Sequence, residues 1–452
     1  MNIKKILFTS SLFILLTVCL LGQKAITPET ALQSYLNNND TSAKWEVLEN
    51  YQIDDVTTYS ILLTSQKWQG IDWKHELIVF VPKTIDFDGS LLFINGGSIK
   101  DGEPKISNKD NDTSKLMASL ANENRAIISL LNQVPNQPLY DDLYEDALIS
   151  YTLNEFKKDS DYSWPLLFPM VKSAQKAMDA VQEFSSETLN HKLTRFILSG
   201  ASKRGWTTWL TGAIDDQRVV ALAPMVIDML NMPATLNYQK EIYGEYSKEI
   251  EDYVKLEIPQ AINSPFGEAL VKMIDPYSYR DMLIIPKMIF FGTNDPYWTI
   301  DAAKHYINDI RGNNLLHYVP NAGHGLGNQQ QAFNSLSAFL ALNLANESLP
   351  VYSWSLTEKK NKINLDIKIT SENFVRAVLW TSNSDSRDFR KAVWKSTDID
   401  QNKKDKSIVK VRLKYPEQGF SAFYVDLIYL NTQGKEYSIS TRAYVADKSK
   451  VL

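Results

Sequence analysis

The sequence predicts an α/β protein, in which a parallel-rich sheet carries helices on both faces, followed by an antiparallel β-sandwich. Between about residues 76 and 345, short apolar runs that end at Pro or Gly alternate with stretches of helical spacing, which indicates alternating strands and helices. A segment rich in Tyr and Glu interrupts this alternation at about 230–285 and predicts a helical cap inserted over the sheet. From residue 349 on, short alternating segments separated by polar turns predict a sandwich of about 100 residues.

The individual elements follow from local patterns. A short helix is expected at 27–36, where Thr27 precedes Pro28 at the first helical position. The strand segments expected in the parallel sheet are 76–82, 90–96, 125–131, 195–200, 219–227, 288–298 and 315–326, the last two running on into loops. The expected helices are 114–124, 170–184, 204–214 and 330–345. The expected sandwich segments are 353–358, 362–370, 376–382, 407–415, 421–430 and 437–445.

The N-terminus has the pattern of a secretory signal peptide. Lys4 and Lys5 precede an apolar run from Ile6 to Leu21, which is too short and too early in the chain to favour a membrane anchor. We expect cleavage near Gly22, so that residues 1–22 are removed and the mature protein is secreted, or periplasmic in a bacterium.

The predicted domains are an α/β domain at 23–348, with its cap at about 230–285, and a β-sandwich at 349–452. Cys19, the one cysteine, lies in the signal peptide, and Val18 stands where a lipoprotein signal prefers a small residue. We therefore expect no lipid anchor, and a mature chain without disulfides or thiolate metal sites.

The overall charge excludes some classes of partner. The formal net charge is −5, and no run of Lys and Arg could follow a phosphate backbone, so no nucleic-acid partner is expected. No cofactor and no metal site are expected either. Three N-x-[ST] patterns, at Asn39, Asn111 and Asn346, would carry glycans in a eukaryotic secretory pathway.

A serine, an aspartate and a histidine stand at predicted strand ends in the order Ser202, Asp295, His324. A serine nucleophile needs a histidine to take its proton and a carboxylate to orient that histidine. In α/β hydrolases the three follow one another in this order, each on a loop after a strand. The sequence therefore predicts a serine hydrolase site.

The other histidines fit this role less well. His324 lies between Gly323 and Gly325 on a loop after a late strand, whereas the other four stand elsewhere in the pattern. These are His75 and His191, which precede the serine, His305 in a helical stretch, and His317 inside a strand.

Two further aspartates compete with Asp295 as the orienting acid. Asp228 also ends a predicted strand and is the alternative acid, although capping of the next segment is a more common role for such a residue. Asp301 is the second competitor.

The serine stands in the stretch LSGASKRGWTTWL, where the glycine expected two residues after it comes at Gly205 instead. We expect this turn to form if Arg204 points away from the adjacent strand. The backbone N–H of Lys203 is the expected first oxyanion donor, and Gly96 or Gly97, at the end of an early strand, supplies the second.

Several residues near the serine are candidates for the pocket wall: Arg204, Tyr297 and Trp298. Lys203 and Arg204 could place positive charge beside the site, but solvated charges on a helix are the expectation for them. Trp206 and Trp209 are expected to serve packing on the helix that follows the serine.

Several stretches together resemble the PhoPQ-activated pathogenicity-related family, which includes the autocrine proliferation repressor proteins of amoebae. These are WPLLFPMVKSAQKAMDAVQEF, LSGASKRGWTTWL, MVIDMLNM, DPYSYRDML, FGTNDPYW and VPNAGHGL. The resemblance covers about residues 30–440 and implies a secreted α/β-hydrolase-like protein. It implies Ser202 in the S-K-R-G motif, Asp295 in G-T-N-D and His324 in N-A-G-H as the site residues.

Two functions remain open from the sequence. The first is a secreted esterase-like or peptidase-like hydrolase, whose partner is a small-molecule, peptide or glycan-ester substrate. The second is a non-catalytic signalling or binding protein on a hydrolase scaffold, whose partner would be a cell-surface receptor. A weaker third idea, glycan binding by the sandwich, rests on Trp354, Trp380 and Trp394, for which core packing is the expectation.

Overall fold

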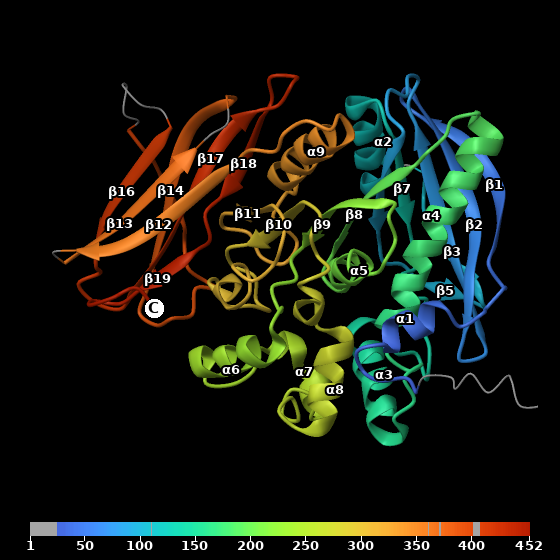
Figure 1. Ribbon diagram of the computed structural model, residues 1–452, viewed down its shortest axis with the longest axis horizontal. Helices are drawn as coiled ribbons and strands as arrows, with labels where there is room; N and C mark the ends of the chain where they lie inside the picture. Colours follow the sequence, from blue (N-terminus) through green and yellow to red (C-terminus); the bar gives the residue numbers. More distant parts are fainter. Residues whose placement is uncertain (1–24, 110, 360, 370–371, 401–406) are drawn as a thin grey trace, which may run out of the picture.

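The structure is a computed structural model that describes residues 25–452, apart from 110, 360, 370–371 and 401–406 (Figure 1). The predicted signal peptide, with Cys19, lies outside the described residues.

One large mixed sheet runs through the molecule (Figure 1). The strands β7, β4, β8, β9, β10 and β11 are parallel, and β1 to β3 extend them as an antiparallel edge. In hydrogen-bonded order the strands are β1 (Lys44–Ile53), β2 (Val56–Trp68), β3 (Ile71–Val81), β7 (Ile127–Leu131), β4 (Gly89–Ile94), β8 (Arg195–Ala201), β9 (Val219–Met225), β10 (Lys287–Gly292), β11 (Asn314–Val319), β18 (Glu436–Ser440), β17 (Phe420–Leu430), β14 (Phe374–Ser384) and β15 (Lys395–Asp398), with β19 (Tyr444–Ala446) beside β17. The short strands β5 (Ile99–Lys100) and β6 (Glu103–Pro104) form a separate pair.

Helices cover both faces of the parallel strands, as predicted. They are α1 (Ala31–Leu36), α2 (Asp112–Asn124), α3 (Glu145–Asp159), α4 (Leu167–Leu189), α5 (Lys203–Thr211), α6 (Met232–Tyr243), α7 (Glu251–Lys255), α8 (Pro265–Ile274) and α9 (Gln330–Leu344), with 3-10 turns at Lys248–Ile250, Pro276–Tyr279 and Ala302–His305. Helices α4 and α5 share one apolar core with the sheet, and α2 and α9 share the other. Burial on both faces explains why β4, β7 and β10 read as continuous apolar runs.

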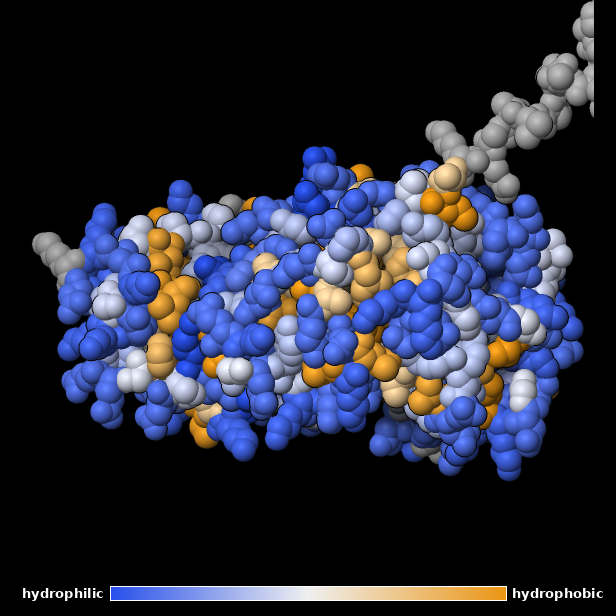
Figure 2. Space-filling model, turned by 90° about the horizontal axis from the view of Figure 1, so that it is seen from below, coloured by the Kyte–Doolittle hydropathy of each residue, from blue (hydrophilic) through white to orange (hydrophobic). Residues whose placement is uncertain are grey.

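The segment at about 230–285 is helical, as expected for a cap. Helices α6, α7 and α8 lie together with α3 below the sheet in the view of Figure 1. Figure 2 looks onto this layer and shows a mostly hydrophilic surface with apolar side chains gathered toward its middle. Helix α3 and the long strands β1 and β2 were not predicted.

The C-terminal strands form two facing antiparallel layers. One is a sheet of β12 (Tyr352–Lys359), β13 (Lys362–Ile369) and β16 (Ile408–Lys414), and the other contains β14, β17 and β18. Strand β18 also pairs with β11 through Ser440 and Leu316, so the second layer continues the large sheet. This connection was not apparent from the sequence. The predicted segment 437–445 is divided between β18 and β19.

In the part of the chain that the structure describes, no helix combines the length and apolar character needed to cross a bilayer.

Candidate active site

Ser202 is the single residue between the end of β8 and the start of α5. Its backbone angles are φ 59° and ψ −126°, a strained conformation for a residue with a Cβ atom. The Ser202 N–H donates to Met225 O on β9 at 2.9 Å, which fixes the turn against the neighbouring strand. Strained backbone of this kind occurs where a fold must hold one side chain in an exposed position at a strand-to-helix turn.

The displaced glycine in this motif has a physical reason. A Cβ atom on Gly205 would lie 2.7 Å from Met225 O, and one on Gly200 would lie 2.8 Å from Arg204 O. Position 205 is therefore the point where α5 approaches β9 too closely for a side chain. Position 204 has room, and its side chain points away toward Val134 and Glu145.

His324 and Asp295 are joined by a hydrogen bond. Asp295 follows β10, His324 follows β11, and His324 Nδ1 lies 2.8 Å from Asp295 Oδ2. The second carboxylate oxygen accepts the N–H of Tyr297 at 2.9 Å, and the side chain of Asp295 is only 6% exposed. The carboxylate therefore holds the imidazole in one orientation. Within the described chain, His324 Nε2 is buried and has no hydrogen-bond partner.

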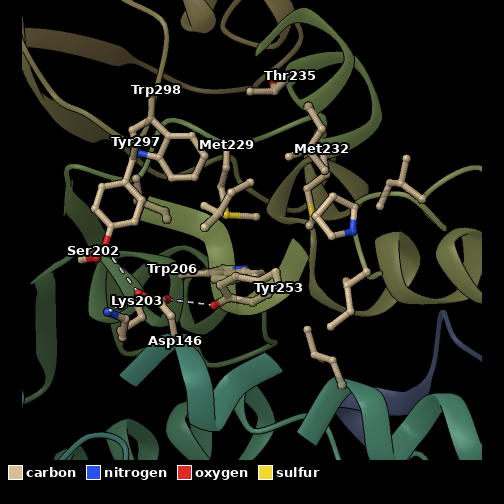
Figure 3. Close-up of a pocket in the computed structure, with 17 residues that line it drawn as sticks. Asp146, Ser202, Lys203, Trp206, Met229, Met232, Thr235, Tyr253, Tyr297 and Trp298 are labelled. Atoms are coloured by element: carbon tan, nitrogen blue, oxygen red, sulfur yellow. Dashed lines mark hydrogen bonds and ion pairs between the residues drawn. The ribbon is translucent and has the colours of Figure 1, made fainter. Parts of the chain in front are cut away.

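Tyr297 connects this pair with Ser202. Its ring packs on the imidazole of His324, with centroids 4.2 Å apart and planes tilted by 31°. Tyr297 also lines the cavity onto which Ser202 opens, and Figure 3 shows the two residues on the same side of it. No hydrogen bond of the Ser202 hydroxyl is found among the described residues. The structure thus brings His324 and Asp295 together, and Tyr297 contacts that pair and lines the Ser202 cavity, but no bond joins Ser202 to His324.

A charged cluster lies beside the serine, and it corrects the expectation of solvated helix charges. Lys203 and Arg204 are only 7% and 9% exposed. Arg204 donates to both carboxylate oxygens of Glu145 at 2.7 Å, and Lys203 Nζ lies 3.0 Å from Glu145 and from Asp146. Burial of Glu145 acts to raise its pKa, but the hydrogen bonds and charges of Arg204 and Lys203 outweigh it and lower the pKa to about 2.

The acidic partners were missed at the sequence level because α3 was not predicted. The signal was an acidic pair, Glu145 and Asp146, at the start of a stretch of helical spacing. Asp146 accepts hydrogen bonds from the hydroxyls of Tyr253 at 2.9 Å and Tyr297 at 3.4 Å, and it lines the cavity. Arg204, proposed from the sequence as a pocket residue, does not line the cavity.

The proposed oxyanion donors lie on one loop and at one helix start: Gly96 and Gly97 follow β4, and Lys203 is the first residue of α5. Gly97 has φ +140°, which favours glycine, and its carbonyl accepts the amide of Gln137 at 3.1 Å. A Cβ atom on Gly96 would lie 2.8 Å from the Arg204 guanidinium, so this glycine lets the charged cluster pack against the loop. Among the described residues, the N–H groups of Gly96, Gly97 and Lys203 donate to no other group.

The two competing aspartates, Asp228 and Asp301, have hydrogen-bond partners other than His324. Asp228 accepts the hydroxyl of Tyr306 at 2.6 Å, and burial raises the pKa of its carboxyl to about 8, so that it is mostly neutral at pH 7. Asp301 accepts the hydroxyl of Tyr238 at 2.7 Å and pairs with Lys304 at 2.9 Å. Asp295 is thus the carboxylate that contacts His324.

The tryptophans take different roles. Trp206 lines the cavity, contrary to the expectation of packing alone, and its indole N–H donates to Ile274 O at 2.6 Å. Trp209 is fully buried, as expected for packing. In the C-terminal layers Trp394 is buried, while Trp354 and Trp380 are half-buried and donate to Tyr444 and Asp426.

A C-terminal segment contacts the loops that bear the acid and the histidine. Asn294, next to Asp295, donates to Ala392 O at 2.7 Å. Asn321, three residues before His324, exchanges two hydrogen bonds with the backbone of Trp394, at 3.0 and 2.8 Å. These contacts hold both loops and were not predicted.

Among the described residues, no group of three or more His, Cys, Asp or Glu side chains is arranged to hold a metal ion.

The fold is a mixed α/β sheet with a parallel core. The chain belongs to the PhoPQ-activated pathogenicity-related protein family, whose model matches residues 32–390. It is 30% identical to Autocrine proliferation repressor protein A of Dictyostelium discoideum over 481 residues, which covers 97% of this chain and 93% of the relative.

Similar solved structures include Acetyl Xylan Esterase 1 from Thermoanaerobacterium sp. JW/SL YS485, with a TM-score of 0.47 and 17% identity over 70% of this chain and 94% of that one. An S-formylglutathione hydrolase from Agrobacterium tumefaciens has a TM-score of 0.43 and 12% identity over 66% of this chain and 99% of that one.

Proposed function

We propose that this protein is a secreted serine hydrolase of the esterase type, with Ser202 as nucleophile, His324 as base and Asp295 as orienting acid. The observation that carries the proposal is the strained position of Ser202 beside a cavity whose wall, Tyr297, packs on the Asp295-bonded imidazole. Secretion rests on the signal-like N-terminal sequence.

The chemistry follows from the free atoms of these side chains. As Ser202 Oγ attacks the ester carbonyl, His324 Nε2 takes the hydroxyl proton and then gives it to the departing alkoxide. Water next attacks the acyl-enzyme, with Nε2 again taking and returning the proton. The Asp295 carboxylate keeps the other ring nitrogen, Nδ1, as the N–H donor and stabilises the imidazolium.

The hydroxyl and Nε2 must approach each other when substrate binds. Catalytic hydrogen bonds are often long or poorly aligned before the substrate is bound, and His324 Nε2 has no other partner in the described chain. The negative charge on the carbonyl oxygen would be met by the N–H of Lys203 and that of Gly96 or Gly97. The Lys203 ammonium is neutralised by Glu145 and Asp146, so it is the backbone of this residue that acts.

Labelling with a fluorophosphonate probe tests the nucleophile. We expect the purified mature protein to be labelled at neutral pH, and Ser202→Ala to abolish the labelling. Ser199→Ala is the matched control, because Ser199 is a buried serine on β8 that donates to Ala223 O. Equal labelling of the Ser202→Ala variant, or no labelling of the folded protein, would exclude the mechanism.

Two acid variants separate Asp295 from the alternative. Asp295→Asn should lower kcat for an ester by about 10³- to 10⁴-fold, because an amide at this place favours the wrong imidazole tautomer. Asp228→Asn should leave kcat within about twofold, since Asp228 contacts Tyr306 instead. If Asp228→Asn lowers kcat more than Asp295→Asn does, Asp228 is the orienting acid.

A second candidate function comes from the relative. The Dictyostelium protein is named as an autocrine proliferation repressor, and its similarity extends over 97% of this chain. The alternative is therefore a secreted signal that acts on a cell-surface receptor. If the purified protein slows proliferation of its own cells and Ser202→Ala does so equally well, signalling does not depend on hydrolysis. Loss of the effect in Ser202→Ala would tie it to catalysis.

A further inference from the structure

The cavity beside Ser202 is lined almost wholly by apolar side chains. Besides the polar residues near the serine, the lining is Leu153, Trp206, Ile227, Met229, Met232, Thr235, Leu236, Ile250, Ile258, Pro259, Ile262 and Trp298. They come from α3, α5, the loop after β9, the cap segment 232–262 and, for Trp298, the loop after β10. Figure 3 shows Ser202, Lys203 and Asp146 together at one end and Met232 and Thr235 at the other.

We infer that this cavity binds a short, unbranched apolar acyl group, so that the substrate is a carboxylic ester of an acid of about four to six carbons. The inference rests on the proposed function. The carbonyl carbon must lie at Ser202, and the chain attached to it then extends between α5 and the cap toward Met232.

Three of the polar groups of the lining are already paired. The Trp206 indole N–H donates to Ile274 O, and the Thr235 hydroxyl donates to Leu230 O at 2.8 Å. The Tyr253 hydroxyl donates to Asp146, and the Asp146 carboxylate also forms an ion pair with Lys203. These residues therefore present their hydrocarbon parts to the cavity, and a sugar or a charged acyl group would lose its hydrogen bonds to water without replacement.

Besides the Ser202 hydroxyl, one side-chain donor of the cavity wall lacks a partner within the described chain. The indole N–H of Trp298 is buried and has no partner. A single neutral donor can donate a hydrogen bond to one oxygen of a substrate, but it cannot satisfy the several hydroxyls of a sugar or the charge of a carboxylate.

The size of the cavity limits the acyl chain. Its volume is about 60 Å³, and a cavity needs roughly 10 to 15 Å³ by the same measure to hold one water. The space thus corresponds to about five water-sized groups, and a methylene group is of similar size. A longer chain would extend beyond this space.

The acyl side of the ester fits this cavity better than the alcohol side. The alcohol leaves after the first step and needs a path to solvent, whereas the acyl group stays bound to Ser202 until water attacks. The apolar lining is buried, including Met229, Leu236 and Ile258. The group that stays attached is therefore the one that belongs against this buried apolar lining.

A series of p-nitrophenyl esters tests the inference. From acetate to butyrate to hexanoate we expect kcat/KM to rise about fourfold for each added methylene, which corresponds to about 0.8 kcal/mol per buried methylene. Decanoate should be poorer than hexanoate. A profile that falls from acetate onward, or that rises without a break to decanoate, would overturn the inference.

Variants at the far end of the cavity make the test specific. Met232→Trp fills the space and should move the optimum toward acetate, and Met232→Ala enlarges it and should move the optimum toward longer chains. Met282→Trp is the matched control, because Met282 is 51% exposed and does not line the cavity. Equal losses for all esters in both Met232 variants would show a general structural effect and count against the inference.

The two possible failures can be told apart. If Ser202-dependent labelling and hydrolysis are present but chain length has no effect, the serine hydrolase function stands and the acyl assignment is wrong. If neither labelling nor hydrolysis occurs, both are wrong.

Discussion

Replacing Asp228 with asparagine is expected to stabilise the protein at neutral pH while leaving ester hydrolysis intact. Asp228 is buried, its carboxyl accepts the Tyr306 hydroxyl at 2.6 Å, and its pKa is raised by burial to about 8. An asparagine keeps the acceptor oxygen for Tyr306 and has the shape of the neutral carboxylic acid, but it carries no charge at any pH.

The sign and size of the effect follow from the pKa. The folded-state pKa lies above the unfolded value near 4, so the folded state binds the proton more tightly. The contribution of Asp228 to stability is therefore full below about pH 4 and is lost as the pH rises through about 8. In this window the difference between variant and wild type grows by about 1.4 kcal/mol per pH unit, or about 3 kcal/mol from pH 5 to pH 7.

Urea unfolding at pH 5, 6, 7 and 8 measures this difference directly. Because Asp275 and Asp426, whose pKa values burial also raises to about 7, are present in both proteins, their titration cancels. The free energy of unfolding of Asp228→Asn should exceed that of the wild type by an amount that increases with pH. Two parallel pH profiles would refute the reasoning, since they would show that Asp228 is ionised alike in both states.

Three further substitutions test other parts of the structure. Asn321→Ala removes two hydrogen bonds to the Trp394 backbone, each worth about 1 kcal/mol. Urea unfolding should therefore show a loss of about 2 kcal/mol in the free energy of unfolding, and ester kinetics should show a lower kcat. An unchanged kcat would mean that this contact does not position the histidine loop. Glu145→Gln should cost about 1 to 2 kcal/mol at pH 7, because the buried Arg204 loses its charged partner, whereas the carboxylate is itself partly exposed. With the pKa of Glu145 lowered to about 2, this stabilisation is present above about pH 4 and is lost as the pH falls toward 2, so equal stabilities of variant and wild type at pH 7 would contradict it. Trp209→Ala should cost about 3 to 5 kcal/mol in the same unfolding assay, since the ring is fully buried on α5; a cost below 1 kcal/mol would show that the core refills the space.

The parallel core could be predicted because its signals are local. Strands such as β4 and β10 are buried on both faces, and a short apolar run closed by Gly marks them without knowledge of their neighbours. The order Ser202, Asp295, His324 at three strand ends was readable for the same reason, and Asp295 and His324 are indeed hydrogen-bonded.

The features that the sequence did not predict depend on contacts between segments far apart in the chain. The burial of Lys203 and Arg204 requires Glu145, which lies 59 positions from Arg204 along the chain. The side chains of β1 alternate only weakly between buried and exposed positions, so the sequence of this strand has no clear two-residue hydrophobic period. The pairing of β18 with β11 is equally non-local and has no signature in either segment.

The shared edge of β11 and β18 means that the C-terminal layers cannot simply be cut away. Removal of the residues after 350 would expose the backbone of β11 as a free edge and take away the Trp394 and Ala392 carbonyls that hold two loops. A shortened chain of this kind should self-associate through that edge. Heat or urea should accordingly unfold the intact protein in one cooperative transition, with both regions losing structure together.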